Sequence, residues 1–251
     1  MSAASRRNVR GGEEARRKGK IESVDAGNRR GLVYTSPGEG KRALLAVCCG
    51  DELEAMLPDM AERLEPMIGK AISPFALASI ADVDWDADYS PWPSNELPGR
   101  AMAGGADALL KVIEGPLLTA ARERLGDVAS LGILGYSLGG LFALYAASRA
   151  DSPFEYAASV SGALWYEGFV EYAADAPFPR LRRAYVSLGR REAKAARGPM
   201  GRSAAASETV YGMLSARLGA DNVAFEWNNG NHFFEVPQRV AKSVAYLCGL
   251  Q

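Results

Sequence analysis

The sequence has few of the residues that build disulfide frameworks and metal sites. It contains three cysteines and one histidine among 251 residues. Cys48 and Cys49 end an apolar segment that we expect to be a strand, where neighbouring side chains point to opposite faces and cannot pair. Cys248 stands alone near the end of the chain, and no ligand spacing typical of zinc occurs. We therefore expect reduced, buried thiols, no metal site and no cofactor.

Long apolar runs and a surplus of basic charge are also absent. No segment approaches the length of a membrane span. A net charge of -1 and a pI near 6.0 argue against a dedicated nucleic-acid-binding protein. These absences predict a cytoplasmic protein with no membrane or nucleic-acid partner.

Basic charge is concentrated at the start of the chain. Residues 1–20 hold seven Lys and Arg against two Glu. We expect a flexible basic tail over 1–20, because charged chain ends are rarely ordered. A targeting presequence is the alternative, which the two acidic residues and the lack of a following apolar stretch disfavour. The remaining residues, 21–251, have the length and hydrophobic content of a single α/β domain.

Short apolar segments alternate with helical periodicity along that domain. Continuous apolar runs, such as 43–48, are typical of strands buried on both faces. We expect strands over residues 31–34, 43–48, 74–80, 131–136, 156–160, 184–188 and 223–227. We expect helices over residues 53–67, 101–125 with a break near Gly115 and Pro116, 138–150, 204–218 and 236–247. This order predicts an α/β fold with a mostly parallel central sheet, helices on both faces, three layers and no large lid domain.

A serine lies at the turn between a predicted strand and an apolar helix. Residues 135–140 read Gly-Tyr-Ser-Leu-Gly-Gly, which matches the Gly-x-Ser-x-Gly nucleophile elbow of the α/β-hydrolase fold. Gly135 and Gly139 give the room that a strained serine needs where strand and helix nearly touch, so we predict Ser137 as nucleophile. The alternatives are a tight crossover with an incidental serine and, with Gly132, a dinucleotide-binding loop. The second alternative lacks the acidic residue expected after the next strand.

The single histidine follows the last predicted strand. His232 lies in a turn-rich loop after residues 223–227, where an α/β hydrolase carries its general base. Because a serine hydroxyl attacks efficiently only when a base takes its proton, we predict that His232 activates Ser137. A lone histidine is more often structural, and its position after the last strand is what favours catalysis here.

A carboxylate is expected between Ser137 and His232 in the chain. Glu192 lies just past the strand predicted over 184–188, and it would hold the imidazole in the correct tautomer. One alternative is that Glu192 is a solvated residue beside two arginines. In two others, Asp221 takes the role although it precedes its strand, or the site works as a Ser–His dyad.

Backbone N–H groups are expected to bind the oxyanion of an acyl-transfer intermediate. Leu138 follows the nucleophile and opens the helix, so its N–H and the positive helix end face the serine oxygen. The second donor is expected in the loop after residues 43–48. We assign it to Gly50, without the support of a His-Gly-Gly-Gly motif.

Several of these segments together resemble the enterochelin-esterase-like and esterase D branch of the α/β-hydrolase superfamily. The matching residues are 135–144, 157–161 with Leu164 and Trp165, 187–189 with Glu192, and 231–233. Trp85 and residues 90–92 are similar to a block found in small bacterial esterases of this group. The resemblance implies the α/β-hydrolase fold, Ser137 and His232 in catalysis and Glu192 as the acid. Family members often have Gly-Asp-x-Glu where this chain has Gly-Arg-Arg-Glu.

Aromatic residues follow strands at the edge that carries the serine. Three come after the second long strand and one after the fourth: Trp85, Tyr89, Trp92 and Trp165. We expect them to line an apolar or aromatic substrate pocket. The alternative for each is that it packs its own loop onto the domain. Because only residues 90–99 could cover the site, a small or medium-sized ester is favoured over a long-chain lipid.

The favoured function is a serine esterase or related acyl hydrolase that takes a small-molecule ester and forms an acyl-enzyme on Ser137. An acyltransferase with the same residues is an alternative, since only the second nucleophile differs. A catalytically silent binding protein of the hydrolase fold is another. The presence of both Ser137 and His232 disfavours it.

Overall fold

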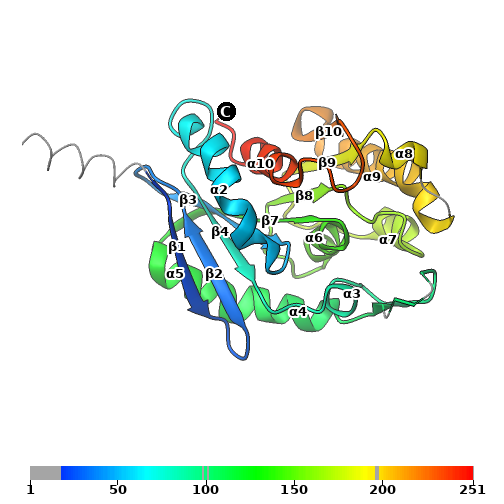
Figure 1. The fold of residues 1–251 in the computed structure, drawn as a ribbon, viewed down its shortest axis with the longest axis horizontal. Coiled ribbons are helices and arrows are strands. Elements are labelled where there is room, and N and C mark those ends of the chain that lie inside the picture. Colours follow the sequence, from blue (N-terminus) through cyan, green and yellow to red (C-terminus); the bar gives the residue numbers. More distant parts are fainter. Residues whose placement is uncertain (1–17, 98, 101, 196–197, 251) are drawn as a thin grey trace, which may run out of the picture.

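A mostly parallel sheet forms the centre of the protein in its computed structural model, which describes residues 18–97, 99–100, 102–195 and 198–250. Its strands are β1 (Lys20–Asp25), β2 (Arg30–Thr35), β3 (Arg42–Cys48), β4 (Phe75–Ile80), β7 (Val128–Tyr136), β8 (Tyr156–Val160), β9 (Arg183–Gly189) and β10 (Val223–Asn228). They lie in the order β1-β2-β4-β3-β7-β8-β9-β10 (Figure 1). From β4 to β10 all neighbours are parallel, and β1 and β2 add an antiparallel edge. A separate pair consists of β5 (Pro93–Ser94) and β6 (Met102–Ala103).

Helices cover both faces of the sheet. On one face α2 (Glu52–Leu64) and α10 (Val236–Leu247) pack together (Figure 1). The other face carries α4 (Ala106–Val112), α5 (Leu118–Leu125), α6 (Leu138–Ser148), α7 (Phe169–Asp175) and α9 (Ser203–Leu218). The three-layer architecture predicted from the sequence is confirmed. Within the described part of the chain, no helix has the length and apolar character needed to cross a membrane.

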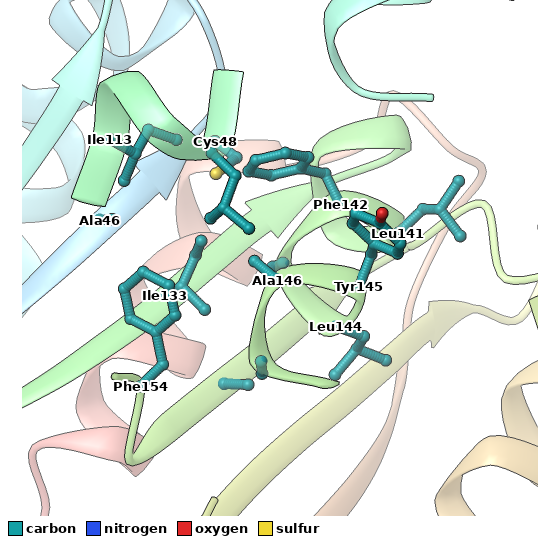
Figure 2. Packing of buried hydrophobic residues seen from close by; sticks show 14 of the residues in the cluster. Ala46, Cys48, Ile113, Ile133, Leu141, Phe142, Leu144, Tyr145, Ala146 and Phe154 are labelled. Atoms are coloured by element: carbon teal, nitrogen blue, oxygen red, sulfur yellow. The ribbon is translucent and has the colours of Figure 1, made fainter. Parts of the chain in front are cut away.

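The two faces of the sheet form two separate hydrophobic cores. In β3, Leu44 and Ala46 belong to one core, while Leu45 and Val47 belong to the other, as the two-residue period of a strand requires. α6 is buried along its whole length, and Figure 2 shows its side chains gathered with Ile133 of β7. Burial on all sides explains why this helix has no polar face, and it gives the start of the helix a rigid support.

Several short elements escape prediction from the sequence. β1 is an edge strand in which only Val24 is buried, so its residues lack the apolar alternation of a strand. The helices α3 (Trp85–Asp88), α7 and α8 (Glu192–Ala195) are one or two turns long, which is too short for a helical period to show. None of them changes the order of the central sheet.

Two predicted segments fall partly outside the described residues. For the basic tail expected over 1–20, residues 1–17 lie outside, and Lys20 begins β1. For the helix expected over 101–125, residue 101 lies outside. The predicted start was too early, because Met102–Ala103 form the strand β6 and the helix begins at Ala106. Residues 106–125 form α4, a π-helical turn over Ile113–Leu117 and α5. The predicted break therefore coincides with the π-helical turn.

β7 and α6 meet at a turn that requires glycine. A Cβ atom on Gly139 would lie 1.9 Å from the carbonyl oxygen of Cys48, and one on Gly135 would lie 2.1 Å from the carbonyl oxygen of Gly139. Both distances are far below van der Waals contact, and both involve backbone atoms that cannot rotate away. The helix therefore approaches β3 and β7 this closely only because both positions lack a side chain.

Gly139→Ala is expected to lower the free energy of unfolding by about 3 kcal/mol, because the added methyl group must push α6 away from β3. The matched control is Gly212→Ala in α9, where nothing lies within 4 Å of the added Cβ. Helix propensity predicts that this control gains about 0.5–1 kcal/mol. Urea unfolding measures both changes, and equal stability of the two variants would contradict the close approach.

Candidate active site

Ser137 lies at the sharp turn between β7 and α6. Its backbone has φ 58° and ψ -122°, a conformation that is costly for a residue other than glycine and persists only where the surroundings impose it. Here hydrogen bonds impose it. The Ser137 N–H donates to the carbonyl of Val160 at 3.0 Å, and its carbonyl accepts from the N–H of Ala163 at 3.0 Å. The turn is thus held from both sides by the end of β8 and the loop that follows it.

His232 reaches Ser137 from the loop between β10 and α10. Its Nε2 atom lies 3.0 Å from the Ser137 Oγ. The imidazole stacks on Tyr136 with ring centroids 4.9 Å apart, and the Tyr136 hydroxyl donates a hydrogen bond to the backbone carbonyl of His232. The residue before Ser137 in the chain therefore holds both the ring and the backbone of His232.

Glu192 lies on the other side of the imidazole, in α8 just after β9. Its Oε2 atom is 2.7 Å from Nδ1 of His232. Its Oε1 atom accepts hydrogen bonds from the Gly189 N–H at 2.7 Å, the Ser161 hydroxyl at 3.0 Å and the Arg239 guanidinium at 2.8 Å. The side chain is only 8% exposed, so the protein rather than water solvates this carboxylate.

The surroundings keep Glu192 ionised. Burial by itself would raise the pKa of Glu192. The hydrogen bond and charge of His232, with further backbone and hydroxyl donors, outweigh burial and bring this pKa below its ordinary value of 4.5. An ionised carboxylate can only accept hydrogen bonds, so His232 Nδ1 carries the proton and Nε2 offers its lone pair to Ser137. That tautomer is the one that a general base needs.

Ser137, His232 and Glu192 all lie on the wall of one cavity of about 880 Å³. Large apolar side chains form much of the wall: Trp85, Trp165, Met200 and Phe233. Phe233 is 81% exposed and Met200 is 45% exposed, so part of the rim is apolar and open to solvent, beside the charged side chains of Arg100 and Arg191. A rim of this kind suits a ligand with an apolar part.

Comparisons with known proteins identify relatives of this chain. Residues 72–209, more than half of the sequence, match the family described as "Putative esterase". The chain belongs to this esterase family. The matched segment includes Ser137 and Glu192 and ends before His232.

One individual protein and several solved structures are also similar to this chain. The esterase is 28% identical over 188 residues to the uncharacterized protein YbbA of Bacillus subtilis (strain 168). The aligned region covers 70% of this chain and 74% of YbbA. The siderophore hydrolase EstA of Aspergillus nidulans matches its fold with a TM-score of 0.68 at 16% identity, over 92% of this chain and 94% of that one. An IroE-like serine hydrolase of Shewanella oneidensis matches with a TM-score of 0.67 at 16% identity, over 91% and 78%.

These relatives confirm the resemblance stated from the sequence. The structural matches establish the α/β-hydrolase fold. Membership of the family makes the protein a carboxylic ester hydrolase.

The structure brings two of the four predicted substrate-binding aromatics to the cavity of the esterase, Trp85 and Trp165. Tyr89 is 1% exposed and packs edge-on against Trp85 with ring centroids 5.2 Å apart. Trp92 donates its indole N–H to the carbonyl of Glu167 at 2.8 Å and packs among tyrosines. The assignment of Tyr89 and Trp92 to substrate is therefore corrected, because their rings fasten their loop to the domain.

The predicted second oxyanion donor is also corrected. The N–H of Gly50 donates to the hydroxyl of buried Tyr89 at 3.1 Å, so it is not free to bind an oxyanion. The sequence does not reveal this pairing, because Tyr89 lies 39 residues further along the chain. Leu138 differs: it begins α6 and lines the cavity, and the N–H groups of a first helical turn have no acceptor within the helix.

Glu192 has two hydrogen-bond partners that were not predicted from the sequence, Arg239 and Ser161. Arg239 lies on the buried face of α10, together with Val240, Val244 and Leu247. An arginine among the apolar positions of an amphipathic helix is a signal in the sequence, because a buried charge needs a partner. Ser161 has a positive φ of 47°. No local sequence pattern predicts its contact with Glu192.

Glu192 is expected to make stability depend on pH. Its pKa is lower in the folded protein than its ordinary value of 4.5, so its ionised form stabilises the fold above that value and this contribution is lost as the pH falls through the lower, folded-state pKa. Urea unfolding between about pH 3 and about pH 8 should show that the stability difference between wild type and Glu192→Gln shrinks in acid.

The matched control is Glu171→Gln, which removes an exposed carboxylate on α7. A stability difference between wild type and Glu192→Gln that stays constant down to the lowest pH would contradict the lowered pKa of Glu192.

Proposed function

We propose that the esterase hydrolyses small carboxylic esters through an acyl-enzyme on Ser137, with His232 as general base and Glu192 as the acid that orients it. The observation that carries this proposal is the unbroken hydrogen-bonded series from Glu192 to His232 to Ser137. Its two contacts measure 2.7 and 3.0 Å, and it lies on the wall of a cavity of about 880 Å³. Acyl transfer to serine needs a nucleophile, a base and an orienting group within such reach.

The first half-reaction acylates the enzyme. Ser137 Oγ bonds to the ester carbonyl carbon while His232 Nε2 takes the hydroxyl proton. The tetrahedral intermediate then collapses, the bond to the alcohol oxygen breaks, and the imidazolium gives its proton to that oxygen. Glu192 stays ionised throughout and stabilises the imidazolium.

The second half-reaction uses water in place of the serine. His232 takes a proton from water as the water oxygen bonds to the acyl carbon. The bond to Ser137 Oγ then breaks, and the imidazolium returns a proton to that oxygen, which releases the acid and restores the hydroxyl. A protonated imidazole cannot begin either half-reaction, so activity falls in acid.

We assign the oxyanion donors to the N–H groups of Leu138 and Asp51. Leu138 adds the positive end of α6 to its own hydrogen bond. Asp51 follows Gly50 at the start of α2, and its N–H has no hydrogen-bond partner among the described residues. The next residue, Glu52, lines the cavity, which supports the choice of this amide over that of Gly50.

A fluorophosphonate probe should label folded wild-type protein and leave Ser137→Ala unlabelled, because the probe traps an activated serine. His232→Gln keeps the hydroxyl but removes the base, so its labelling should be slower by roughly a thousandfold or more. Intact-mass spectrometry over time measures the adduct, and circular dichroism checks that each variant is folded. Failure of folded wild type to react would refute the proposed nucleophile.

Two tryptophans give a matched test of the substrate pocket. Trp165→Ala removes part of the cavity wall and should lower kcat/KM for an aryl ester roughly tenfold or more. Its effect on the melting temperature should be smaller than that of Trp92→Ala. Trp92→Ala removes a ring that packs among tyrosines and is not part of the cavity wall. It should therefore lower the melting temperature more than Trp165→Ala does, and lower kcat/KM less. Steady-state kinetics measure kcat/KM of both variants, and thermal unfolding measures their melting temperatures. A larger loss of kcat/KM in Trp92→Ala than in Trp165→Ala would contradict the assignment of Trp165 to the substrate pocket.

A further inference from the structure

Arg239 is a charged side chain in the interior of the protein. It lies in α10, seven residues after His232, and it is 1% exposed. A guanidinium is always ionised, so its burial is unfavourable unless carboxylate and carbonyl oxygens replace the lost water. The partners that replace water here all belong to the neighbourhood of the proposed triad.

The two terminal nitrogens of Arg239 bind two different parts of that neighbourhood. Nη1 donates to Glu192 Oε1 at 2.8 Å and to the Ser161 hydroxyl at 2.9 Å. Nη2 donates to the backbone carbonyls of Asn229 at 2.6 Å and Asn231 at 2.8 Å. Nη1 is thus bound to the Glu192 carboxylate, and Nη2 is bound to the loop that carries His232.

The remaining oxygen of the carboxylate accepts from His232 itself at 2.7 Å. A single planar guanidinium therefore joins Glu192, which accepts this hydrogen bond, to the loop that carries His232, which donates it. Because the guanidinium is rigid and its N–H groups point in fixed directions, it sets the distance between Glu192 and the loop that carries His232. A lysine ammonium has the same charge but cannot span both partners in this way.

We propose that Arg239 is a positioning residue for ester hydrolysis, which holds Glu192 and the His232 loop at the separation that directs the imidazole to Ser137. This proposal rests on the function proposed above. Arg239 touches none of the reacting atoms, and it acts through Glu192 and through the carbonyls of Asn229 and Asn231. Small displacements of a catalytic group cost large factors in rate, so the effect appears in kcat rather than in substrate binding.

A second arginine provides the matched control for a purely structural role. Arg183 also fastens α10 to the rest of the domain, since its Nη1 donates to the carbonyl of Tyr246 at 3.2 Å and its guanidinium lies over the Tyr246 ring at 5.6 Å. Arg183 begins β9, whereas Glu192 follows the end of that strand. Arg183→Met should therefore lower the melting temperature and leave kcat within about twofold of wild type.

The test compares Arg239→Lys and Arg239→Met with this control, using an aryl ester and thermal unfolding. We expect both Arg239 variants to lose roughly 10- to 100-fold in kcat, with Met the slower, and to keep KM within about twofold. Folded Arg239 variants with wild-type kcat would overturn the proposal. An equal loss of kcat in Arg183→Met would overturn it too, because loosening α10 would then explain the result.

A double variant tests whether Arg239 acts through Glu192, separately from the proposed function of the site. It also gives a protein that can be measured if Arg239→Met does not fold. Arg239→Met with Glu192→Gln removes both buried charges, so it leaves no unpaired carboxylate and should fold even where Arg239→Met does not. If Arg239 acts through Glu192, the combined loss of kcat is smaller than the product of the two single losses. Where Arg239→Met alone does not fold, the comparison uses Arg239→Lys both alone and combined with Glu192→Gln. Fully multiplicative losses would overturn the proposal, whereas an active Ser137→Ala would overturn the proposed function instead.

Discussion

α6 approaches β3 so closely that a Cβ atom at Gly139 would lie 1.9 Å from the carbonyl oxygen of Cys48. This contact makes the turn before the helix as tight as the backbone allows, and Ser137 takes its positive φ there. The same contact brings the first N–H groups of α6 beside the serine oxygen, where the helix dipole is most positive. Burial of the helix on all sides then keeps the arrangement rigid. The rest of the site is built around this one fixed point.

The other members of the site come from the ends of neighbouring parallel strands. Ser161 follows β8, Glu192 follows β9 and His232 follows β10, so the sheet order brings together residues far apart in the chain. Their hydrogen bonds hold one ionised carboxylate and one guanidinium in the interior of the protein. Each of these charges would be unfavourable alone, and each is stabilised because the other, with backbone donors and acceptors, replaces water. The proposed chemistry and the folding stability thus involve the same contacts.

The aromatic residues around the site divide into two groups with different roles. Trp85 and Trp165 form walls of the cavity. Tyr89 and Trp92 are not part of that wall, and their polar atoms bind backbone partners, the Gly50 N–H and the Glu167 carbonyl. Tyr and Trp combine an apolar ring that packs in the core with a polar atom that can hydrogen-bond to a buried backbone group. Such residues can therefore fasten a loop to the domain as well as bind a ligand.

The sequence by itself determined the order of the longer strands and helices, the turn glycines around Ser137, and the placement of His232 and Glu192 after strands. These features depend on local spacing and on chain order, which a linear pattern records. Tertiary structure alone decided that Gly50 gives its N–H to Tyr89, that only two of the four aromatics line the cavity, and that Arg239 binds Glu192. Each of those outcomes is a pairing between residues distant in the chain. It is selected by which neighbour can satisfy a buried polar group once the sheet has formed.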